Sequence, residues 1–242
     1  MDQLNSNISV DFVIFGFDSK QLKVLLVERD KLPEERPDLP SGILKLPGSL
    51  IRDTDDLDRA AYRILKELTG LDHVFLKQFA IFGKPDRLNK PNDLIWLRSN
   101  SGLQIGRVVT VTYYGVLKIV RSNPSKTLLG RTYWIPVKKL PQLAFDHNFI
   151  IESALKAIRK EMQTDPFGSE LLPKKFTIRQ IQNLYEEIFD ITLDNRNFRK
   201  KISKLNYFVA LPEKEKKVNH KPALLYKLDK KRLPKPRKML VL

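Results

Sequence analysis

The sequence predicts an α/β protein in which an α/β/α sandwich is followed by a smaller domain of two helices and a β-hairpin. Runs of β-branched and aromatic residues lie before and after an amphipathic helical pattern near residue 60. Residues 164–173 are dense in proline, glycine and turn-forming side chains, which is typical of a domain boundary. Two more helical patterns and two short strand patterns follow that boundary.

The composition favours a folded protein outside the membrane. At 242 residues the chain is long enough for one large domain or two modest ones, and 42% hydrophobic residues argue against disorder. The absence of cysteine excludes disulfides and thiolate metal sites and fits a reducing compartment. No apolar run reaches the ~20 residues of a membrane span, and residues 1–9 lack the order of a signal peptide. We therefore expect a cytoplasmic location and no membrane partner.

The charge is unevenly distributed. Lysine and arginine outnumber aspartate and glutamate by 44 to 28, which gives a formal net charge of +16. Residues 165–242 hold 19 basic and 9 acidic residues, so the shorter C-terminal part carries most of the excess. A basic block suggests a polyanionic partner, most often nucleic acid. The alternative is a basic surface that serves only solubility.

The first part of the chain alternates strands with one strong helix. Residues 8–17 and 22–29 predict a β-hairpin, and a proline-rich loop that includes Pro33, Pro37 and Pro40 follows it. Such loops often carry binding groups. Further patterns predict strands at 74–82, 106–120 and 133–137, a long loop that begins at Gly83, and a helix at 149–162.

The helix near residue 60 has clear start and stop signals. Thr54 or Asp55 can cap its N-terminus, where the helix dipole also favours the nearby acidic residues. Gly70 ends it, because glycine adopts the left-handed C-terminal conformation without steric cost. The apolar residues recur at spacings of three and four, as in a half-buried helix: Leu57, Ala60, Ala61, Ile64, Leu65 and Leu68.

This loop, helix and glycine resemble the signature of the Nudix hydrolases. With Arg63 placed on the arginine of that pattern, Glu67 falls on the first residue of its glutamate pair and Gly70 on its glycine. Leu65 and Leu71 take the apolar positions, Asp55 takes the earlier acidic position, and Ser49 replaces the opening glycine. The resemblance implies a Nudix α/β/α sandwich.

Two positions depart from the pattern. Active Nudix enzymes carry glutamate where this chain has Ile64 and Leu68, and these glutamates hold Mg²⁺ on one helical face. Glu67 alone cannot replace them. We therefore expect no catalytic residues, no metal site, no cofactor and no hydrolysis.

The resemblance also places candidate effector contacts on or beside the loops of the Nudix cleft. For each of them a surface salt bridge is the alternative role. His147 and His220 have no ligand spacing, so no zinc site is expected. Trp96, Tyr113, Tyr114 and Trp134 are expected in the core. The candidate effector-binding residues are Arg29, Lys45, Arg63, Glu67 and Asp86.

The C-terminal part resembles a winged helix-turn-helix domain. Thr177 can cap a helix at 178–189, and a second helix at 194–205 turns Phe198, Ile202 and Leu205 inward. Strands at 208–211 and 223–228 surround a loop rich in lysine and glutamate. In a winged helix the second helix enters the DNA major groove and the hairpin contacts the backbone or the minor groove.

The outward face of that second helix is basic and carries no acid. Arginine pairs with guanine and asparagine with adenine, whereas lysine suits phosphates. The alternative is a solvated helix face, but ordinary surfaces mix both signs of charge. Among the wing lysines, Lys214 is a further candidate. The candidate DNA-binding residues are Thr177, Arg179, Asn195, Arg196, Asn197, Arg199, Lys200, Lys201, Lys204, Lys216, Lys217 and Lys221.

A degenerate Nudix domain followed by a winged helix resembles a family of bacterial Nudix-related transcriptional regulators, over residues 8–230. One branch of that family senses ADP-ribose-like metabolites and another binds a pentose sugar. The second branch looks closer, because the acids for metal-diphosphate binding are missing. The predicted domains are a Nudix-like effector-sensing domain at 1–164, a winged-helix DNA-binding domain at 165–230 and a basic tail at 231–242.

The resemblance thus implies a homodimeric, ligand-responsive regulator, a repressor that binds a double-stranded DNA operator. Its small-molecule effector is expected to be a pentose sugar, or an ADP-ribose-like nucleotide. The first alternative is an active Nudix pyrophosphatase with an ADP-ribose-like substrate and a nucleic-acid-binding appendage. The second is an RNA-binding or scaffold protein with an inactive Nudix fold.

Overall fold

A computed structural model of the chain describes residues 3–29, 42–119, 126–127, 130–162, 171–216, 218–219 and 221–232. The chain divides into two compact units, each assembled from separate stretches of sequence. Unit 1 consists of Met1–Phe15, Lys23–Val116 and Arg121–Ala154, and unit 2 consists of Gly16–Leu22, Leu117–Val120 and Leu155–Leu242.

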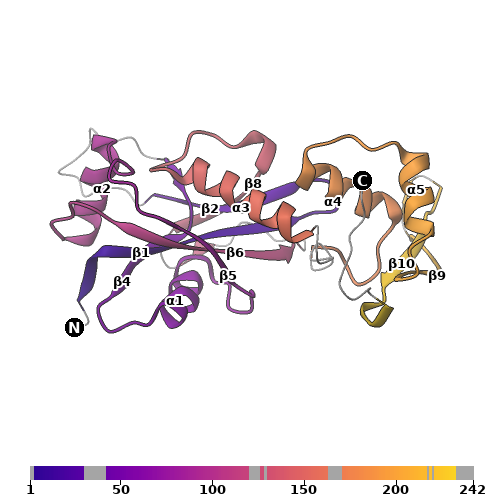
Figure 1. The fold of residues 1–242 in the computed structure, drawn as a ribbon, viewed down its shortest axis with the longest axis horizontal. Coiled ribbons are helices and arrows are strands. Elements are labelled where there is room, and N and C mark those ends of the chain that lie inside the picture. The colour runs from indigo at the N-terminus through magenta and orange to yellow at the C-terminus, as the bar shows by residue number, and fades with distance from the viewer. Residues whose placement is uncertain are drawn as a thin grey trace. The chain divides into compact units, whose positions relative to one another are not determined.

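An eight-stranded sheet forms the framework of unit 1 (Figure 1). Its strand order is β5-β6-β1-β2-β8-β7, while β3 pairs with β2 and β4 pairs with β1. Strand β1 is buried from Ser9 to Phe17, as expected for a central strand that is covered on both faces. The strands are β1 (Leu4–Phe17), β2 (Leu22–Glu28), β3 (Leu44–Lys45), β4 (Gly48–Arg52), β5 (Lys77–Phe82), β6 (Val109–Lys118), β7 (Lys126–Thr127) and β8 (Gly130–Pro136).

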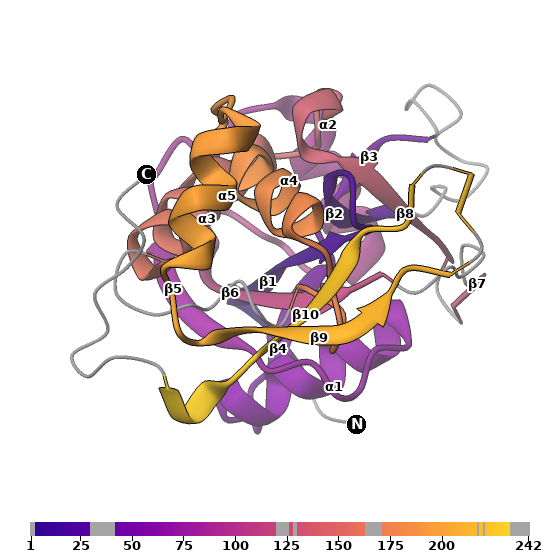
Figure 2. The same ribbon diagram turned by 90° about the vertical axis from the view of Figure 1, so that its right-hand side faces the viewer.

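Helix α1 (Leu57–Thr69) covers one face of this sheet, and α3 (His147–Met162) lies on the other (Figure 1 and Figure 2). The α/β/α arrangement predicted from the sequence is therefore confirmed. The N-cap of α1 is Asp56, one or two residues later than the predicted Asp55 or Thr54. Its carboxylate accepts a hydrogen bond from the backbone N–H of Arg59 at 2.8 Å. Gly70 ends the helix in the left-handed conformation, with φ of 73°.

Helix α2 (Pro91–Ser101) lies where the sequence predicted a continuing loop, so that prediction was wrong. Its apolar residues, 94–97, are consecutive and spread around the helix, so they give no helical period. Its boundary signals are nevertheless regular. Pro91 occupies the first turn, and Gly102 ends the helix with φ of 69°.

The remaining boundaries in unit 1 differ little from expectation. Strand β5 begins at Lys77 rather than at residue 74, and α3 begins two residues earlier than predicted, at His147. A short 3-10 helix, Val137–Lys139, follows β8. The proline-rich loop around residues 33–40 lies outside the described residues. No helix in the described ranges is long and apolar enough to cross a membrane.

The two C-terminal helices and the hairpin form the largest part of unit 2 (Figure 2). Their apolar faces pack together around Leu184, Ile188, Phe198 and Ile202, which are all buried. The Thr177 side chain and Gln180 form a capping box at the first of these helices. The elements are α4 (Ile178–Phe189), α5 (Asn195–Ser203), β9 (Phe208–Lys214), β10 (Leu224–Leu228) and a 3-10 turn, Lys230–Arg232. The helix pair and hairpin predicted from the sequence are confirmed.

The turn between α4 and α5 is held by side chains of α4. The Glu186 carboxylate accepts hydrogen bonds from the backbone N–H of Leu193 and from Gln182 Nε2, both at 2.9 Å. Gln182 Nε2 also donates to the carbonyl of Leu193 at 2.8 Å. The Tyr185 and Phe198 rings lie 6.1 Å apart between the two helices. Together these contacts fix the angle at which α5 leaves α4.

Candidate functional site

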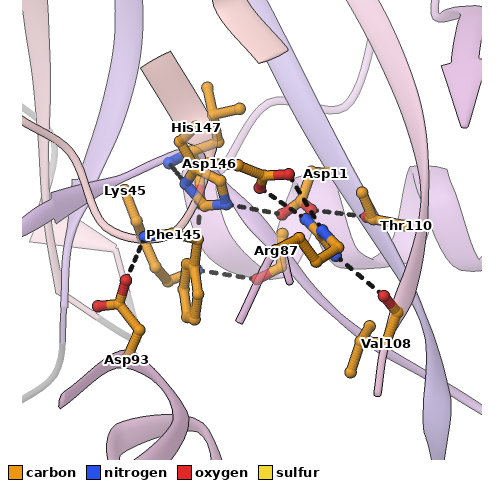
Figure 3. Close-up of polar contacts among 11 residues, drawn as sticks. Asp11, Lys45, Arg87, Asp93, Val108, Thr110, Phe145, Asp146 and His147 are labelled. Atoms are coloured by element: carbon orange, nitrogen blue, oxygen red, sulfur yellow. Dashed lines mark hydrogen bonds and ion pairs between the residues drawn. The ribbon is translucent and has the colours of Figure 1, made fainter. Parts of the chain in front are cut away.

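Buried polar side chains of unit 1 meet where β1, the segment before β4 and the start of α3 come together (Figure 3). The Asp11 carboxylate accepts a hydrogen bond from the Thr110 hydroxyl at 2.6 Å. His147 Nδ1 accepts one from the backbone N–H of Leu46 at 2.9 Å. The other ring nitrogen, Nε2, lies 3.8 Å from Asp11 Oδ1. The contacts therefore join four parts of the chain that are far apart in sequence.

His147 is uncharged in this setting. Burial lowers its pKa to about 3, and the nearby Lys45 ammonium acts in the same direction. Since Nδ1 accepts a hydrogen bond, the single proton of the neutral ring lies on Nε2 and faces the Asp11 carboxylate. No role for His147 was predicted from the sequence, because a lone histidine outside any motif carries no signal.

Gly48 is required at the floor of this cluster. A Cβ atom there would lie 1.9 Å from Asp11 Oδ1 and 2.6 Å from the carbonyl oxygen of Val10, so no other residue fits. Beside it, Lys45 Nζ donates to the carbonyls of Leu46 at 3.2 Å and of Gly48 at 2.9 Å. These residues line an inner recess of about 50 Å³, which has room for only small groups.

A second buried cluster lies beside the recess and ties α2 to the segment before α3. Arg29 forms an ion pair with Asp93, whose other carboxylate oxygen accepts a hydrogen bond from the backbone N–H of Phe145 at 2.6 Å. The Arg29 guanidinium also lies 4.8 Å from the centre of the Trp96 ring and 5.2 Å from that of Phe145. Arg29 was predicted to contact an effector. It is 6% exposed and paired with Asp93 in the wall of the site, and its role in effector binding stays a prediction.

A larger outer cavity, of about 550 Å³, opens next to the recess. Arg87 and Phe145 line both spaces, and Arg87 donates to both carboxylate oxygens of Asp146 at 2.9 and 3.1 Å. This volume lies in the usual range for small-molecule sites. The rest of the wall comes from β5, the loop after it and α3: Ile81, Phe82, Gly83, Lys84, Asp86, Asn89, Lys90 and Phe149.

The outer cavity combines an accessible aromatic ring with cations. Phe149 is 48% exposed and packs edge-on against Phe82, with ring centres 5.8 Å apart. Lys84 Nζ lies 5.8 Å from the centre of the Phe149 ring, and Lys90 Nζ donates to the carbonyl of Phe145 at 3.0 Å. Such a wall can hold a planar ring by stacking and an anion by charge. The sequence found Asp86 here but missed the two lysines that flank it.

The two candidate effector residues on α1 are not brought to this site. Arg63 forms ion pairs with Asp55 and with Glu67, the latter at 3.1 Å, and in the described part of the chain neither Arg63 nor Glu67 lines the recess or the outer cavity. Burial acts to raise the pKa of Asp55, but hydrogen bonds from the Arg52 backbone and the Arg63 side chain lower it overall. Of the five predicted contacts, Lys45 lines the inner recess and Asp86 lines the outer cavity, whereas Arg29, Arg63 and Glu67 are not among the described residues that line these two spaces.

The departures from the Nudix pattern lie on the inner side of α1. Ile64 is 1% exposed and packs in the core, and Leu68 is half-buried. Within the described ranges, no group of three or more histidine, aspartate or glutamate side chains is arranged to hold a metal ion.

In unit 2, the outer face of α5 is basic. Helix α5 contains no acidic residue, and Phe198 and Ile202 turn inward. Thr177 is only 3% exposed and its hydroxyl caps α4, so it does not lie on this exposed face, and its role in DNA binding stays a prediction. Arg179 Nη1 donates to Asn195 Oδ1 at 2.5 Å, which joins the start of α4 to the start of α5. The exposed residues are Arg179, Asn195, Arg196, Asn197, Arg199, Lys200, Lys201 and Lys204.

The β9–β10 hairpin is a weaker candidate, because it mixes both signs of charge. Lys214, Lys216 and Lys221 are exposed, whereas Lys217 lies outside the described residues. Glu213 is bound by Lys175 at 2.6 Å, and the hydrogen bond from that ammonium group lowers the pKa of Glu213. This pair fixes the hairpin to the segment before α4.

Comparisons with known proteins find matches to both parts of the chain. A family model described as the NrtR DNA-binding winged helix domain matches residues 168–228. The ADPR responsive transcriptional repressor NtrR of Acinetobacter baylyi is 26% identical over 223 residues, which cover 91% of this chain and 81% of that protein. Shewanella oneidensis NrtR, in a crystal structure with a 27mer DNA, is 24% identical and has a TM-score of 0.65, with 96% of this chain and 97% of that chain covered.

A MutT/nudix family protein from Enterococcus faecalis has a TM-score of 0.60 at 23% identity, with 93% of this chain and 88% of that chain covered. At these identities the solved structures show the fold, and they confirm the predicted Nudix fold followed by a winged helix. The sugar-responsive branch that the sequence favoured is not supported, because the matched repressor is named for ADP-ribose. The chain therefore has a Nudix fold followed by a C-terminal winged helix, and residues 168–228 match the NrtR DNA-binding winged helix domain.

Proposed function

We propose that this protein is a transcriptional repressor whose DNA binding responds to ADP-ribose or a closely similar nucleotide. The observation that carries the proposal is that one chain has both a surface suited to DNA and a cavity suited to a nucleotide. Unit 2 exposes an acid-free basic helix, α5, and unit 1 holds a cavity with an aromatic ring and cations. The relative that aligns with 91% of the chain is named as an ADPR responsive repressor.

The outer cavity suits the parts of such a nucleotide. Lys84 and Lys90 supply positive charge for a diphosphate, and the exposed Phe149 ring supplies a face on which adenine can stack. Asp86 and Asn89 offer oxygen acceptors for ribose hydroxyl groups. We assign the effector to this cavity rather than to the inner recess, because about 50 Å³ cannot hold a nucleotide.

The missing Nudix glutamates do not argue against this effector. Metal-bound carboxylates are needed to cleave a diphosphate, whereas a site that only binds one can hold it with ammonium and guanidinium groups. The pentose expectation took the loss of metal ligands at positions 64 and 68 as a loss of diphosphate binding. Because the cavity wall is cationic, it can bind a diphosphate without the metal ligands that are needed to cleave one.

A thermal-shift screen combined with DNA titration tests the proposal. ADP-ribose should raise the unfolding temperature, whereas arabinose and ribose should leave it unchanged, because only a ligand of the native state stabilises it. ADP-ribose should also weaken operator binding by roughly 5- to 150-fold, the usual range of allosteric coupling. The double variant Lys84→Ala/Lys90→Ala should lose the stabilisation, while Lys66→Ala on α1 should keep it. A chain that ignores ADP-ribose would refute the effector assignment.

We also propose that the Nudix domain is not hydrolytic. Ile64 lies in the core, and Glu67 is engaged by Arg63, so the face that would hold the metal offers no free carboxylate pair. With Mg²⁺ and ADP-ribose, the chain should release no AMP. Release that scales with protein and stops in chelator would favour the pyrophosphatase instead.

A homodimer remains part of the proposal. Two winged helices can read two half-sites that are spaced by whole turns of the duplex, which is how dimeric regulators gain specificity. Sedimentation of the full chain should give twice the monomer mass of 28.2 kDa at micromolar concentration. A monomer that still binds one half-site would contradict the dimer but not the repressor.

A further inference from the structure

The β1–β2 hairpin and helix α3 both continue from unit 1 into unit 2. Gly16–Leu22, the tip of the β1–β2 hairpin, belongs to unit 2, and so does the second half of α3, from Leu155 onward. Within unit 2, both of these stretches form hydrogen bonds with α4, the first helix of the helix-turn-helix.

The hairpin tip is closed by side-chain hydrogen bonds and makes two of the bonds to α4. Asp18 Oδ1 accepts hydrogen bonds from the backbone N–H groups of Lys20 at 3.0 Å and of Gln21 at 2.9 Å, which closes the turn. Ser19 is held there in the left-handed region, with φ of 78°. These contacts set the direction in which the tip presents its backbone.

The same tip then binds the middle of α4. Asn183 Nδ2 donates to the carbonyl of Ser19 at 3.1 Å. The backbone N–H of Leu22 donates to Glu187 Oε2 at 2.9 Å. Asn183 and Glu187 are one turn apart and therefore lie on one face of α4, so the tip holds that face at two points.

Arg159 of α3 holds the end of the same helix. Its Nε donates to the carbonyl of Ile188 at 2.6 Å. The last carbonyls of a helix have no partner within the helix, and a cation there also interacts well with the helix dipole. Arg159 therefore anchors the end of α4 that leads directly into the turn before α5.

The elements that form hydrogen bonds with α4 also carry residues that line the inner recess or the outer cavity. Strand β1 carries Asp11, and α3 begins at His147 and includes the exposed Phe149. Helix α3 is continuous over its 16 residues, about 24 Å. A packed helix or strand shifts as a body rather than deforming locally, so a displacement at one end reaches the other.

We infer that Asn183, Glu187 and Arg159 are positioning residues that transmit occupancy of the outer cavity to α4, and through its fixed turn to α5. This inference rests on the proposed function. Ligand stacked on Phe149 biases the position of α3. The hairpin tip and Arg159 pass that bias to α4. None of the three residues is among the described residues that line the inner recess or the outer cavity, and none lies on α5.

The test measures coupling rather than binding. The coupling factor is the ratio of the DNA dissociation constants of the full chain with saturating ADP-ribose and without it. Asn183→Ala and Glu187→Ala should each lower this factor by roughly two- to tenfold, which corresponds to the loss of one net hydrogen bond. Glu187→Gln keeps an acceptor for the Leu22 N–H and should retain the factor. Lys160→Ala, an exposed cation of α3 close to Arg159, is the matched control and should also retain it.

The outcomes separate the two proposals. Loss of coupling in the alanine variants, with both separate affinities unchanged within about twofold, supports the inference. Unchanged coupling in those variants overturns it and leaves the repressor intact. A lower basal DNA affinity with unchanged coupling shows that these contacts only support α4, and it also overturns the inference. If the parent chain ignores ADP-ribose or DNA, the proposed function itself fails.

Discussion

The imidazole of His147 accepts a hydrogen bond from the backbone N–H of Leu46, 101 residues earlier in the chain. This bond ties the first turn of α3 to the segment that precedes β4. It requires an unprotonated Nδ1, so the contact exists only while the ring is neutral. One of the contacts that hold the start of this helix therefore depends on the protonation of a titratable group.

Stability should therefore depend on the protonation of His147. Its pKa is about 3 in the folded chain, against 6.5 for an ordinary histidine. Above pH 6.5 both folded and unfolded chains are neutral at this residue, and the full stability is present. As the pH falls toward 3, the unfolded chain gains a proton that the folded chain does not take up. The free energy of unfolding should then fall by up to ~1.4 kcal/mol per pH unit.

Urea denaturation of the parent chain and of His147→Gln at a series of pH values measures this contribution. The variant should be less stable at neutral pH, because its contacts are imperfect, but its stability should fall less steeply between pH 6.5 and 4. Titration of the carboxylates changes the free energy of unfolding of both chains by the same amount. Parallel curves would contradict the assignment of a neutral folded histidine.

Gly48→Ala should destabilise unit 1. The added Cβ would collide with Asp11 Oδ1, at 1.9 Å, and with the backbone oxygen of Val10, which cannot move without shifting β1. Overpacking of this kind costs about 1–3 kcal/mol. Gly106→Ala is the control, since a Cβ there meets nothing within 4 Å. Thermal melting of both variants against the parent chain checks the difference, and equal melting temperatures would be inconsistent with it.

Restoring one Nudix glutamate by Ile64→Glu should damage the fold rather than restore catalysis. The side chain at position 64 is 1% exposed, so a carboxylate there would be buried without a partner. An uncompensated buried charge costs about 3–5 kcal/mol. Lys66→Glu, on the exposed side of α1, should change stability by about 0.5 kcal/mol. Denaturant titration decides, and a variant as stable as the parent would show that α1 can turn this face to solvent.

Glu186→Ala should loosen the helix-turn-helix. The substitution leaves the N–H of Leu193 and the amide of Gln182 without their shared acceptor, at a cost of about 1–3 kcal/mol. DNA affinity should fall with it, because the angle of α5 is no longer fixed. Glu186→Gln retains an acceptor and should lose less in both measurements. Thermal melting and fluorescence-anisotropy titrations measure both effects. Identical results for the two variants would show that the acceptor at position 186 does not hold the turn between α4 and α5.

Substitutions on α5 should separate sequence reading from phosphate binding. Arg196→Ala should cost about 1–3 kcal/mol on the cognate operator and relax specificity at one position. Lys200→Ala should weaken all duplexes alike and reduce the slope of log affinity against log salt by about 1. Lys156→Ala, exposed on α3, serves as the control. Titrations with cognate and scrambled duplexes at several salt concentrations measure the affinity of all three variants. If Arg196→Ala lost equal affinity for both duplexes, Arg196 would contact a phosphate rather than a base.

The sequence predicted the elements whose boundaries and faces are encoded locally. Helix α1 has its acidic start, its apolar stripe and Gly70 at its end. Helices α4 and α5 carry caps at Thr177 and Asp194 and a clear apolar side. These signals depend on neighbours three or four residues away, so a single sequence contains them.

The cavity could not be predicted in the same way, because its walls are assembled from distant segments. Arg29 pairs with Asp93 and Arg87 with Asp146, at sequence separations of 64 and 59. Helix α2, which supplies Asp93, has no apolar period and was missed. An isolated sequence marks the charged residues of such pairs as candidate ligands, although two charges that face each other in the interior serve the fold instead.

The hydrogen bonds from Leu22 and Arg159 to α4 also constrain how the chain acquires its fold. Unit 2 is completed by Gly16–Leu22, which leaves the ribosome some 150 residues before α4 does. The C-terminal helices thus pack against a segment that is synthesised much earlier. Contacts between residues so far apart in sequence form slowly. A fragment cut at the residue 164 boundary would lack both anchors, and biochemistry on it would describe a looser helix pair than the one in the intact chain.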